Sequence, residues 1–297
     1  MVPIGIVDAH HHVWRRADLP WLAGPMVPRI FGPHEPIRRD YSIEEYLADV
    51  AGCGVTQSVY VQANWPLDRV LDEVRWVHEV HERSGWPSAI VACADLFDPD
   101  AGHVLAAEEA ASPLVRGIRL QLHWHENEQY RFASAPDRMR DPVLRENVAR
   151  LAALGWVFEL QVFSGQMQDA ADFVAALPEV TFVLLHAGMP ESAAPEHVEP
   201  WLAGLELLAP LPNLCVKLSG QGTFVHRVDD ELIGLVTRMC LEGFGSRRCM
   251  YGSNFPIEKL WTDYPSLVGA WQRALAGEPD TVRRDVFEET ARRVYRL

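Results

Sequence analysis

The chain has 297 residues, of which 48% are hydrophobic and 23% charged, and its formal net charge is −14. This length allows one large barrel or two domains with a sizeable core. The acidic balance argues against nucleic acids and anionic membranes as partners, because phosphate binding requires clustered Lys and Arg. We therefore expect a small-molecule partner, and the charge leaves open whether the protein is a monomer or a homo-oligomer.

The chain alternates short apolar runs with amphipathic segments. Eight runs are typical of strands: 5–10, 56–63, 89–96, 115–122, 156–162, 180–188, 214–219 and 249–255. Helical segments between them include 43–54, which follows Ser42 as a candidate N-cap, and 67–85 and 142–155, which both end on glycine. Alternating strands and helices imply parallel strands joined by crossover helices.

Eight strand–helix units in 297 residues are the number and length of a (β/α)8 TIM barrel. A doubly wound open sheet is the competing α/β fold, but no Gly-rich phosphate loop follows the first strand. We therefore predict a single (β/α)8 barrel domain over residues 1–297.

Two connections, 15–41 and 123–141, are too long to be simple turns. Both follow strands, so both belong to the C-terminal mouth of the barrel, where long loops usually act as lids or binding walls. Trp14 and Trp124 also follow strands. They are candidates to stack on a substrate ring, with packing under the loops as the equal alternative.

The stretch IVDAHHHVW places three histidines at the end of the first strand. Successive strand side chains point to opposite faces, so His10 and His12 share one face and His11 takes the other. Two imidazoles on one face suit a metal site or an acid/base site. A polar strand end without a chemical role is the alternative.

Other predicted strands also end in polar groups that an ordinary core would not leave unpaired. His186 ends the sixth strand, and Asn254 ends the eighth, which lies beside the first in a closed barrel. Strands four, five and seven add further polar candidates: Arg119, Gln121, Glu159, Gln161 and Lys217. A cation inside a barrel is costly without a partner, so Arg119 and Lys217 are expected to face a substrate carboxylate, an oxyanion or Glu159. The pattern leaves open which face of strands four and five points inward.

DAHHHVW, GIR in the fourth strand, LHAG, VKLSG and YGSNFP resemble the amidohydrolase superfamily, and more narrowly its amidohydrolase-2 group of lactonases and, more distantly, nonoxidative decarboxylases. The resemblance implies that His10 and His12 are the family's HxH pair and that His186 is its later strand-end histidine. These three are the implied ligands of one divalent metal ion, Zn²⁺ or Mn²⁺. His11 is then a packing or supporting residue. Asn254 stands where the family usually has an aspartate, and no candidate for a carboxylated lysine ends the fourth strand, so a binuclear centre is not expected.

The amide of Asn254 cannot take a proton from water at neutral pH, so it is not the general base. Three imidazoles holding Zn²⁺ would produce a bound water with a pKa of about 7. Alternatively, without metal, a histidine deprotonates water while Arg119 or Lys217 stabilises the oxyanion. In a third interpretation the barrel no longer catalyses hydrolysis and performs other chemistry or only binds a ligand. Asn254 keeps a role in ligation or in orienting the substrate.

Opening a lactone suits the first two routes, because water adds to an activated carbonyl and a cation stabilises the developing charge. Amide hydrolysis requires protonation of the leaving nitrogen, and no acid is evident. The predicted function is hydrolysis of a small carboxylated or sugar-acid lactone at the C-terminal mouth. The alternatives are a nonoxidative decarboxylase and a barrel that only binds its ligand.

Several further motifs have a structural explanation that is at least as good as a functional one. His123, His125 and Glu126 imitate a second HxH motif and could line the pocket or form a second metal site, but their long loop can also point them to solvent. Glu258 and Lys259 could reach the mouth from the last loop, but two neighbouring opposite charges are more typical of a solvated turn. No GxSxG elbow supports a serine hydrolase.

The cysteines, five in number and scattered, indicate reduced thiols, with Cys215 and Cys249 as core residues. No signal peptide or membrane-length apolar run is evident, so a cytoplasmic location is expected.

Overall fold

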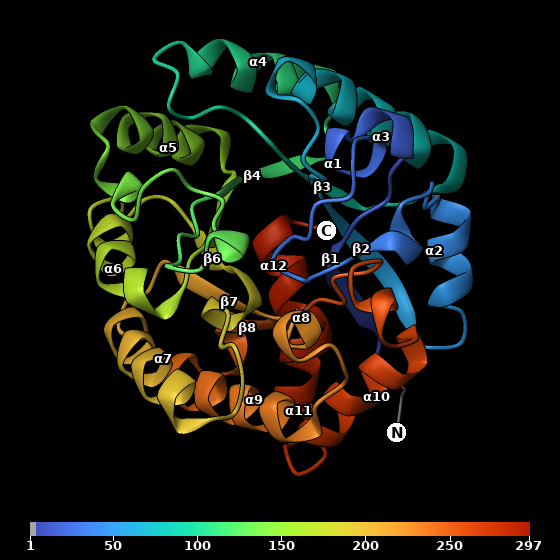
Figure 1. Cartoon of the computed structure of the whole chain (residues 1–297), viewed down its shortest axis with the longest axis vertical. Helices are drawn as coiled ribbons and strands as arrows, with labels where there is room; N and C mark the ends of the chain where they lie inside the picture. The colour runs from blue at the N-terminus through green and yellow to red at the C-terminus, as the bar shows by residue number, and fades with distance from the viewer. Residues whose placement is uncertain (1–3) are drawn as a thin grey trace.

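The computed structural model describes residues 4–297 and confirms the TIM barrel (Figure 1). Eight parallel strands form one sheet in the order β1 to β8. They are β1 (Ile6–His11), β2 (Val55–Val61), β3 (Ala89–Ala92), β4 (Val115–Gln121), β5 (Val157–Gln161), β6 (Phe182–Leu184), β7 (Leu214–Leu218) and β8 (Cys249–Tyr251).

Helices surround the strands as an outer ring (Figure 1). They are α1 (Pro20–Ala23), α2 (Ile43–Asp49), α3 (Val70–Ser84), α4 (Ala101–Ala111), α5 (Pro142–Leu154), α6 (Met167–Ala175), α7 (Pro195–Leu208), α8 (Gly222–Val225), α9 (Asp230–Phe244), α10 (Tyr264–Ala274), α11 (Asp280–Arg284) and α12 (Thr290–Tyr295). The predicted caps are confirmed: the Ser42 hydroxyl accepts from the Glu45 amide, and α3 and α5 end at left-handed glycines, Gly85 and Gly155.

The barrel closes between β1 and the segment that follows β8. The His12 amide donates to the Phe255 carbonyl and the Asn254 amide to the His10 carbonyl, both at 2.7 Å. Below them, the buried Asp8 carboxylate accepts from the Ser253 amide at 2.8 Å and from two tyrosine hydroxyls, Tyr46 and Tyr264. These bonds hold the histidine segment against the Asn254 turn.

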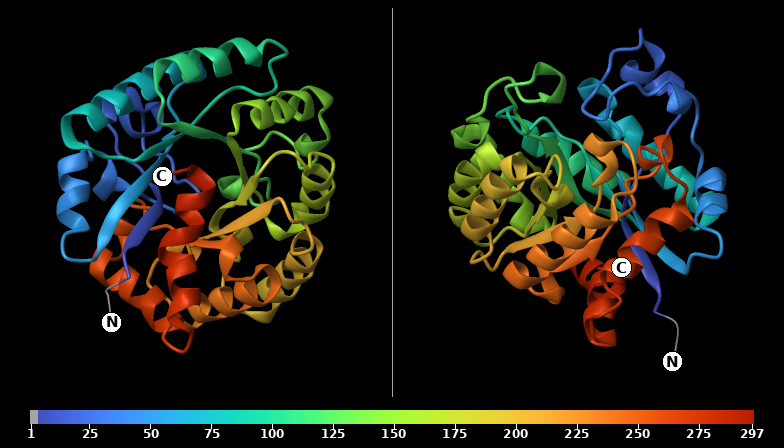
Figure 2. Two further views of the ribbon diagram at one scale, coloured as in Figure 1. Left: turned by 180° about the vertical axis from the view of Figure 1, so that it is seen from behind. Right: turned by 60° about the horizontal axis from the view of Figure 1, so that its bottom comes forward.

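The lower interior of the barrel is an apolar core. Its buried side chains are Val7, Ala9, Val59, Val61, Ala89, Val91, Val157, Val183, Cys215 and Met250. Helix α12 covers the N-terminal opening below this core, as the view from behind shows (Figure 2). The chemistry of the barrel is therefore confined to the opposite, C-terminal mouth.

No helix among residues 4–297 is long and apolar enough to cross a membrane. The cysteines are all unpaired, and Cys215 and Cys249 are buried in strands, as predicted for core residues.

Candidate active site

Three histidines from distant parts of the chain form one cluster at the mouth. The ring centre of His10 lies 5.1 Å from that of His12 and 4.9 Å from that of His186. His11 points to the other side of β1, where it stacks on Tyr46 of α2 at 4.0 Å. The division of the three consecutive histidines between two faces thus agrees with strand alternation.

Alternation does not hold along the whole of β1, however. The pairing register with β2 shifts between Asp8 and His11. Asp8 hydrogen bonds to Tyr46 of α2 and Tyr264 of α10, whereas His10, two residues later, packs on His186 at the mouth. The irregularity lets the same short strand clamp the outer helices and supply the histidine cluster.

Hydrogen bonds orient two of the three rings. His12 Nδ1 lies 2.6 Å from the Val61 carbonyl oxygen, and His186 Nδ1 lies 2.8 Å from the Ser219 hydroxyl. These bonds engage Nδ1 and leave Nε2 of each ring for a ligand. Both ring nitrogens of the buried His10 lack a partner. Close approach of Gly220 to His186 requires glycine, because a Cβ there would lie 2.5 Å from Nδ1 and the backbone φ is +70°.

The cluster is electrically neutral at physiological pH. Burial, together with the charges of Arg119 and Lys217, lowers the pKa of His186 to about 3. The pKa values of His10 and His12 are likewise well below the usual value, mainly through burial. Neutral imidazoles are the form that accepts a proton or binds a metal.

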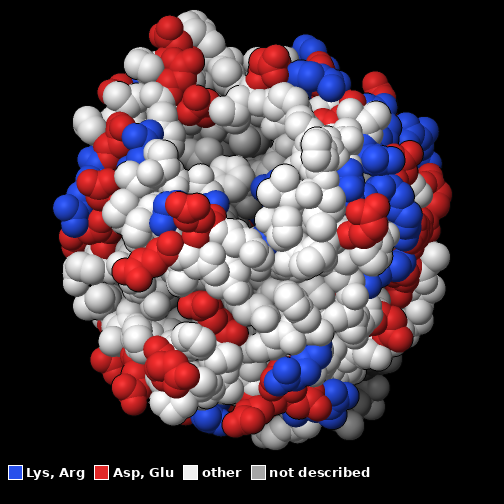
Figure 3. Space-filling view, viewed as in Figure 1, with Lys and Arg blue, Asp and Glu red and all other residues white. Residues whose placement is uncertain are grey.

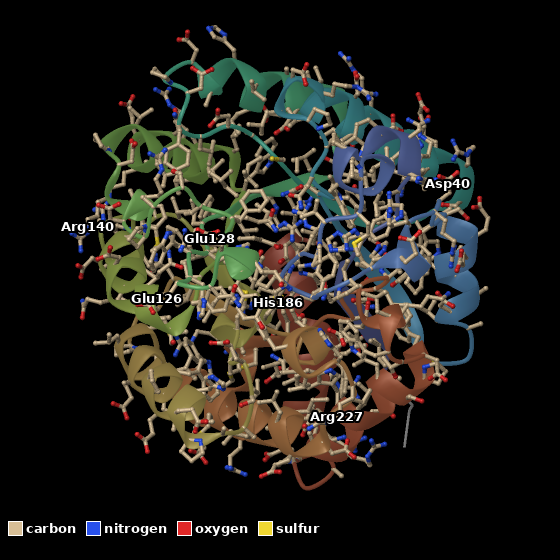
Figure 4. All side chains as sticks on the ribbon, viewed as in Figure 1. Asp40, Glu126, Glu128, Arg140, His186 and Arg227 are labelled. Atoms are coloured by element: carbon tan, nitrogen blue, oxygen red, sulfur yellow. The ribbon has the colours of Figure 1, made fainter. Side chains whose placement is uncertain are left out.

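A cavity of about 530 Å³ opens above the cluster. The predicted site residues on its lining are His12, Trp14, Arg119, Gln121, Gln161, His186 and Asn254. The hollow is visible in the space-filling view (Figure 3), and His186 lies near the centre of the same view (Figure 4). His10 is fully buried and is not on the lining, although its ring touches two rings of the cluster.

The structure separates the two predicted cations. Lys217 Nζ lies 2.6 Å from Glu159 Oε1, both side chains are fully buried, and the Tyr295 hydroxyl of α12 donates to the same oxygen. Lys217 does not line the cavity; of the partners expected for it, the structure shows Glu159 and not a position facing a substrate. Arg119 does line the cavity. One of its nitrogens donates to the Gln62 carbonyl, and its Nε is buried without a partner.

Trp124 is also outside the cavity lining. Its ring lies 4.8 Å from the guanidinium of Arg131, so the loop-packing alternative describes it better than substrate stacking does. Both long connections nevertheless form cavity walls, as predicted: the first contributes Trp21, Arg29 and Phe31 and the second Phe132. Sequence reasoning missed these individual side chains because loop patterns do not disclose direction.

Asn254 occupies a strained turn at the cavity edge. Its φ is +58°, a left-handed conformation that asparagine tolerates better than most residues. The side chain contacts Glu258, whose carboxylate also accepts from Trp261 Nε1 at 2.7 Å. Glu258 is buried, and burial raises its pKa to about 7. Its interpretation as part of a solvated turn is therefore wrong, whereas Lys259 is half-buried and pairs with Asp49 on the outside.

The second HxH motif is split by its loop. His123 is buried on the cavity lining, whereas His125 Nε2 pairs with Glu191 at 3.4 Å. As they stand, no three His, Cys, Asp or Glu side chains among residues 4–297 are arranged to hold a metal ion. His10, His12 and His186 nevertheless offer the imidazole nitrogens that Zn²⁺ prefers, so this cluster matches a metal site in its donor chemistry but not in its present arrangement.

Residues 7–297 match the family model described as "Amidohydrolase". An uncharacterized protein of Sinorhizobium fredii is 30% identical over the full length of both chains. The L-fucono-1,5-lactonase of Burkholderia multivorans is 29% identical, covering 98% of this chain and 96% of the relative. A zinc-bound amidohydrolase structure from Burkholderia multivorans superposes with a TM-score of 0.83 at 27% identity, covering 99% of both chains. The chain therefore belongs to the amidohydrolase family and is a lactonase-like hydrolase within it.

Proposed function

We propose that this protein opens a small lactone to its hydroxy acid at the histidine cluster. The observation that carries the proposal is one cavity lined by two neutral histidines of the cluster, His12 and His186, an arginine with a free donor and a strand-end amide. Similarity to an L-fucono-1,5-lactonase supports the reaction class. The carboxylated or sugar-acid nature of the lactone is part of the proposal.

The protein side chains divide the work of ester hydrolysis. His12 or His186 takes a proton from water as the oxygen attacks the lactone carbonyl, and Arg119 stabilises the oxyanion that forms. Collapse of that oxyanion breaks the ring C–O bond, and the histidine returns the proton to the departing alkoxide. Asn254 orients the substrate through its amide, since it cannot act as the base.

His10, His12 and His186 are the residues that would hold a divalent metal ion. Such an ion, when bound, lowers the pKa of water and polarises a carbonyl. Val61 and Ser219 hold Nδ1 of His12 and of His186, so each ring presents its other nitrogen to the cavity. This orientation suits both proton transfer from water and the binding of a metal ion.

The test is acid release from a panel of carboxylated and neutral sugar lactones, followed in a pH-stat after elemental analysis of the purified protein. We expect turnover of at least one lactone, and its loss in His186→Asn. Absence of turnover across the panel, with and without added Zn²⁺ or Mn²⁺, would contradict the proposal. Ligand-dependent thermal shifts without product would then identify a binding barrel, and CO₂ release from hydroxybenzoates a decarboxylase.

A further inference from the structure

Arg29, in the connection between β1 and α2, is an arginine without a partner. Among residues 4–297 its guanidinium pairs with no carboxylate and donates no side-chain hydrogen bond; it lies over the ring of Trp21, 5.0 Å from the ring centre. The side chain lines the cavity. The backbone beneath it is held, because the Arg29 carbonyl accepts from Gln129 Nε2 at 2.9 Å.

The other arginines of this connection show that the loop normally engages its cations. Arg15 pairs with Asp18 at 2.5 Å, Arg38 with Glu35 at 3.1 Å and Arg39 with Glu45 at 2.6 Å. Arg16 Nε donates to the Leu22 carbonyl at 3.2 Å. Arg29 is thus the exception, and it is the arginine of the loop that faces the cavity.

The charge balance of the cavity also favours an anion. Arg119 lies close enough to Arg29 that its charge, after burial, lowers the pKa of Arg29. Glu159, the carboxylate whose charge acts most strongly on Arg119, is already committed to Lys217 and Tyr295. Glu128, the carboxylate on the lining, has an almost fully exposed side chain on the outer loop. A third arginine on the lining, Arg131, pairs with Glu128 at 3.9 Å, which among residues 4–297 leaves Arg29 and Arg119 facing the cavity without a carboxylate. These two cations repel each other unless an anion enters.

We propose that Arg29 binds a carboxylate substituent of the lactone, so that the substrate is an acidic lactone rather than a neutral sugar lactone. Arginine presents a planar fork that matches a carboxylate, and the Trp21 ring behind it limits its orientation. Arg119, buried beside the histidines, is then left to face the reacting carbonyl. This inference rests on the proposed lactonase function, because it names the class of lactone.

A matched pair of lactones tests it. Glucono-1,4-lactone and glucaro-1,4-lactone differ at one terminal carbon, which is a hydroxymethyl group in the first and a carboxylate in the second. We expect the wild-type protein to prefer the glucarolactone. In Arg29→Gln, kcat/KM for that lactone falls on the order of 30-fold, mainly through KM, while the value for gluconolactone changes less than about twofold. Arg29→Lys retains an intermediate preference.

Arg39→Gln is the matched control, because it removes an arginine of the same loop that pairs with Glu45 outside the cavity. We expect it to leave both lactones unaffected. Equal losses on both lactones in Arg29→Gln, or a wild-type preference for gluconolactone, would overturn the inference while leaving the lactonase function intact.

Binding without turnover separates this inference from the reaction. Tetrahydropyran-2-carboxylate and tetrahydropyran-2-methanol have a ring but no lactone carbonyl. By calorimetry, we expect the carboxylate to bind more tightly to the wild-type protein, with an advantage that shrinks in salt and disappears in Arg29→Gln. If no lactone is opened but this advantage is found, the proposed function fails and the anion site stands. Equal affinity for the two ethers, or failure of both to bind, would overturn the anion site.

Discussion

The two ends of the barrel interior differ in how completely their side chains are satisfied. The lower end is apolar: Val91, Val183 and Met250 are fully buried and belong to one hydrophobic cluster. The mouth instead contains buried polar atoms without partners, among them both ring nitrogens of His10 and the Nε of Arg119. An unpaired buried polar group costs about 1–3 kcal/mol. At the mouth, where the cavity opens, a substrate or ion can complete these bonds.

Between the two ends lies a layer whose charges satisfy one another. Glu159 of β5 accepts from Lys217 of β7 and from Tyr295 of α12, each at 2.6 Å. These bonds connect the closing helix to two strands directly beneath the cavity. The Glu159–Lys217 pair therefore holds structural charge that does not face the cavity, in contrast to Arg119 on the cavity lining.

The largest expected effect comes from exchanging one side chain at each end. His186→Asn should lower kcat/KM by at least about 1000-fold, because it removes a cluster imidazole, while unfolding free energy changes little since asparagine tolerates the φ of +52°. Met250→Ala should do the reverse, with a loss of about 2–4 kcal/mol in unfolding free energy and near-normal activity of the folded protein. Lactone hydrolysis and urea unfolding measure the two. Similar stability losses in both variants would contradict the division.

A second prediction concerns the intermediate layer. Lys217→Met leaves Glu159 buried without its cation and should cost about 3–5 kcal/mol in unfolding free energy. The double variant Glu159→Gln/Lys217→Met should recover most of that loss, because neither charge is then stranded. Denaturant unfolding of the wild type, the single variants Glu159→Gln and Lys217→Met and the double variant gives the coupling energy. Additive losses would show that the pair does not act as a unit.

The smallest expected effect is a pH dependence of stability that comes from Glu108 of α4, a buried carboxylate outside the barrel interior. Both carboxylate oxygens are buried without partners, and burial, with the charge of Glu73, raises the pKa of Glu108 to about 9. Because the folded-state pKa lies above the unfolded value, stability is fully present below about pH 4.5 and falls as pH rises toward 9.

Glu108→Gln should remove this pH dependence, which amounts to roughly 2 kcal/mol between pH 5 and 7. Melting curves of both proteins across this range provide the measurement, with activity unchanged as the control. Parallel pH profiles for the two proteins would show that Glu108 ionises normally.

Much of the fold was predictable because local signals carry it. Glycines at the ends of α3 and α5, the Ser42 cap and the repeated strand–helix alternation are properties of neighbouring residues. The histidine cluster was predictable as well, since parallel strands of a barrel present their C-terminal ends at one mouth. Long-range pairing decided what the sequence left open, because Lys217 pairs with Glu159 and Trp124 packs against Arg131. The same kind of pairing overturned the solvated-turn interpretation of Glu258, which contacts Asn254.

By itself, the sequence determined the barrel, the faces of His10, His11 and His12, and the family of the chain, because periodicity and strand order are written in consecutive residues. Only the tertiary structure decided which cation stays free. Arg119 and Lys217 look alike along their strands, and only the spatial position of Glu159 distinguishes them. The same holds for Arg29, whose availability depends on which carboxylates its loop brings near and which it does not.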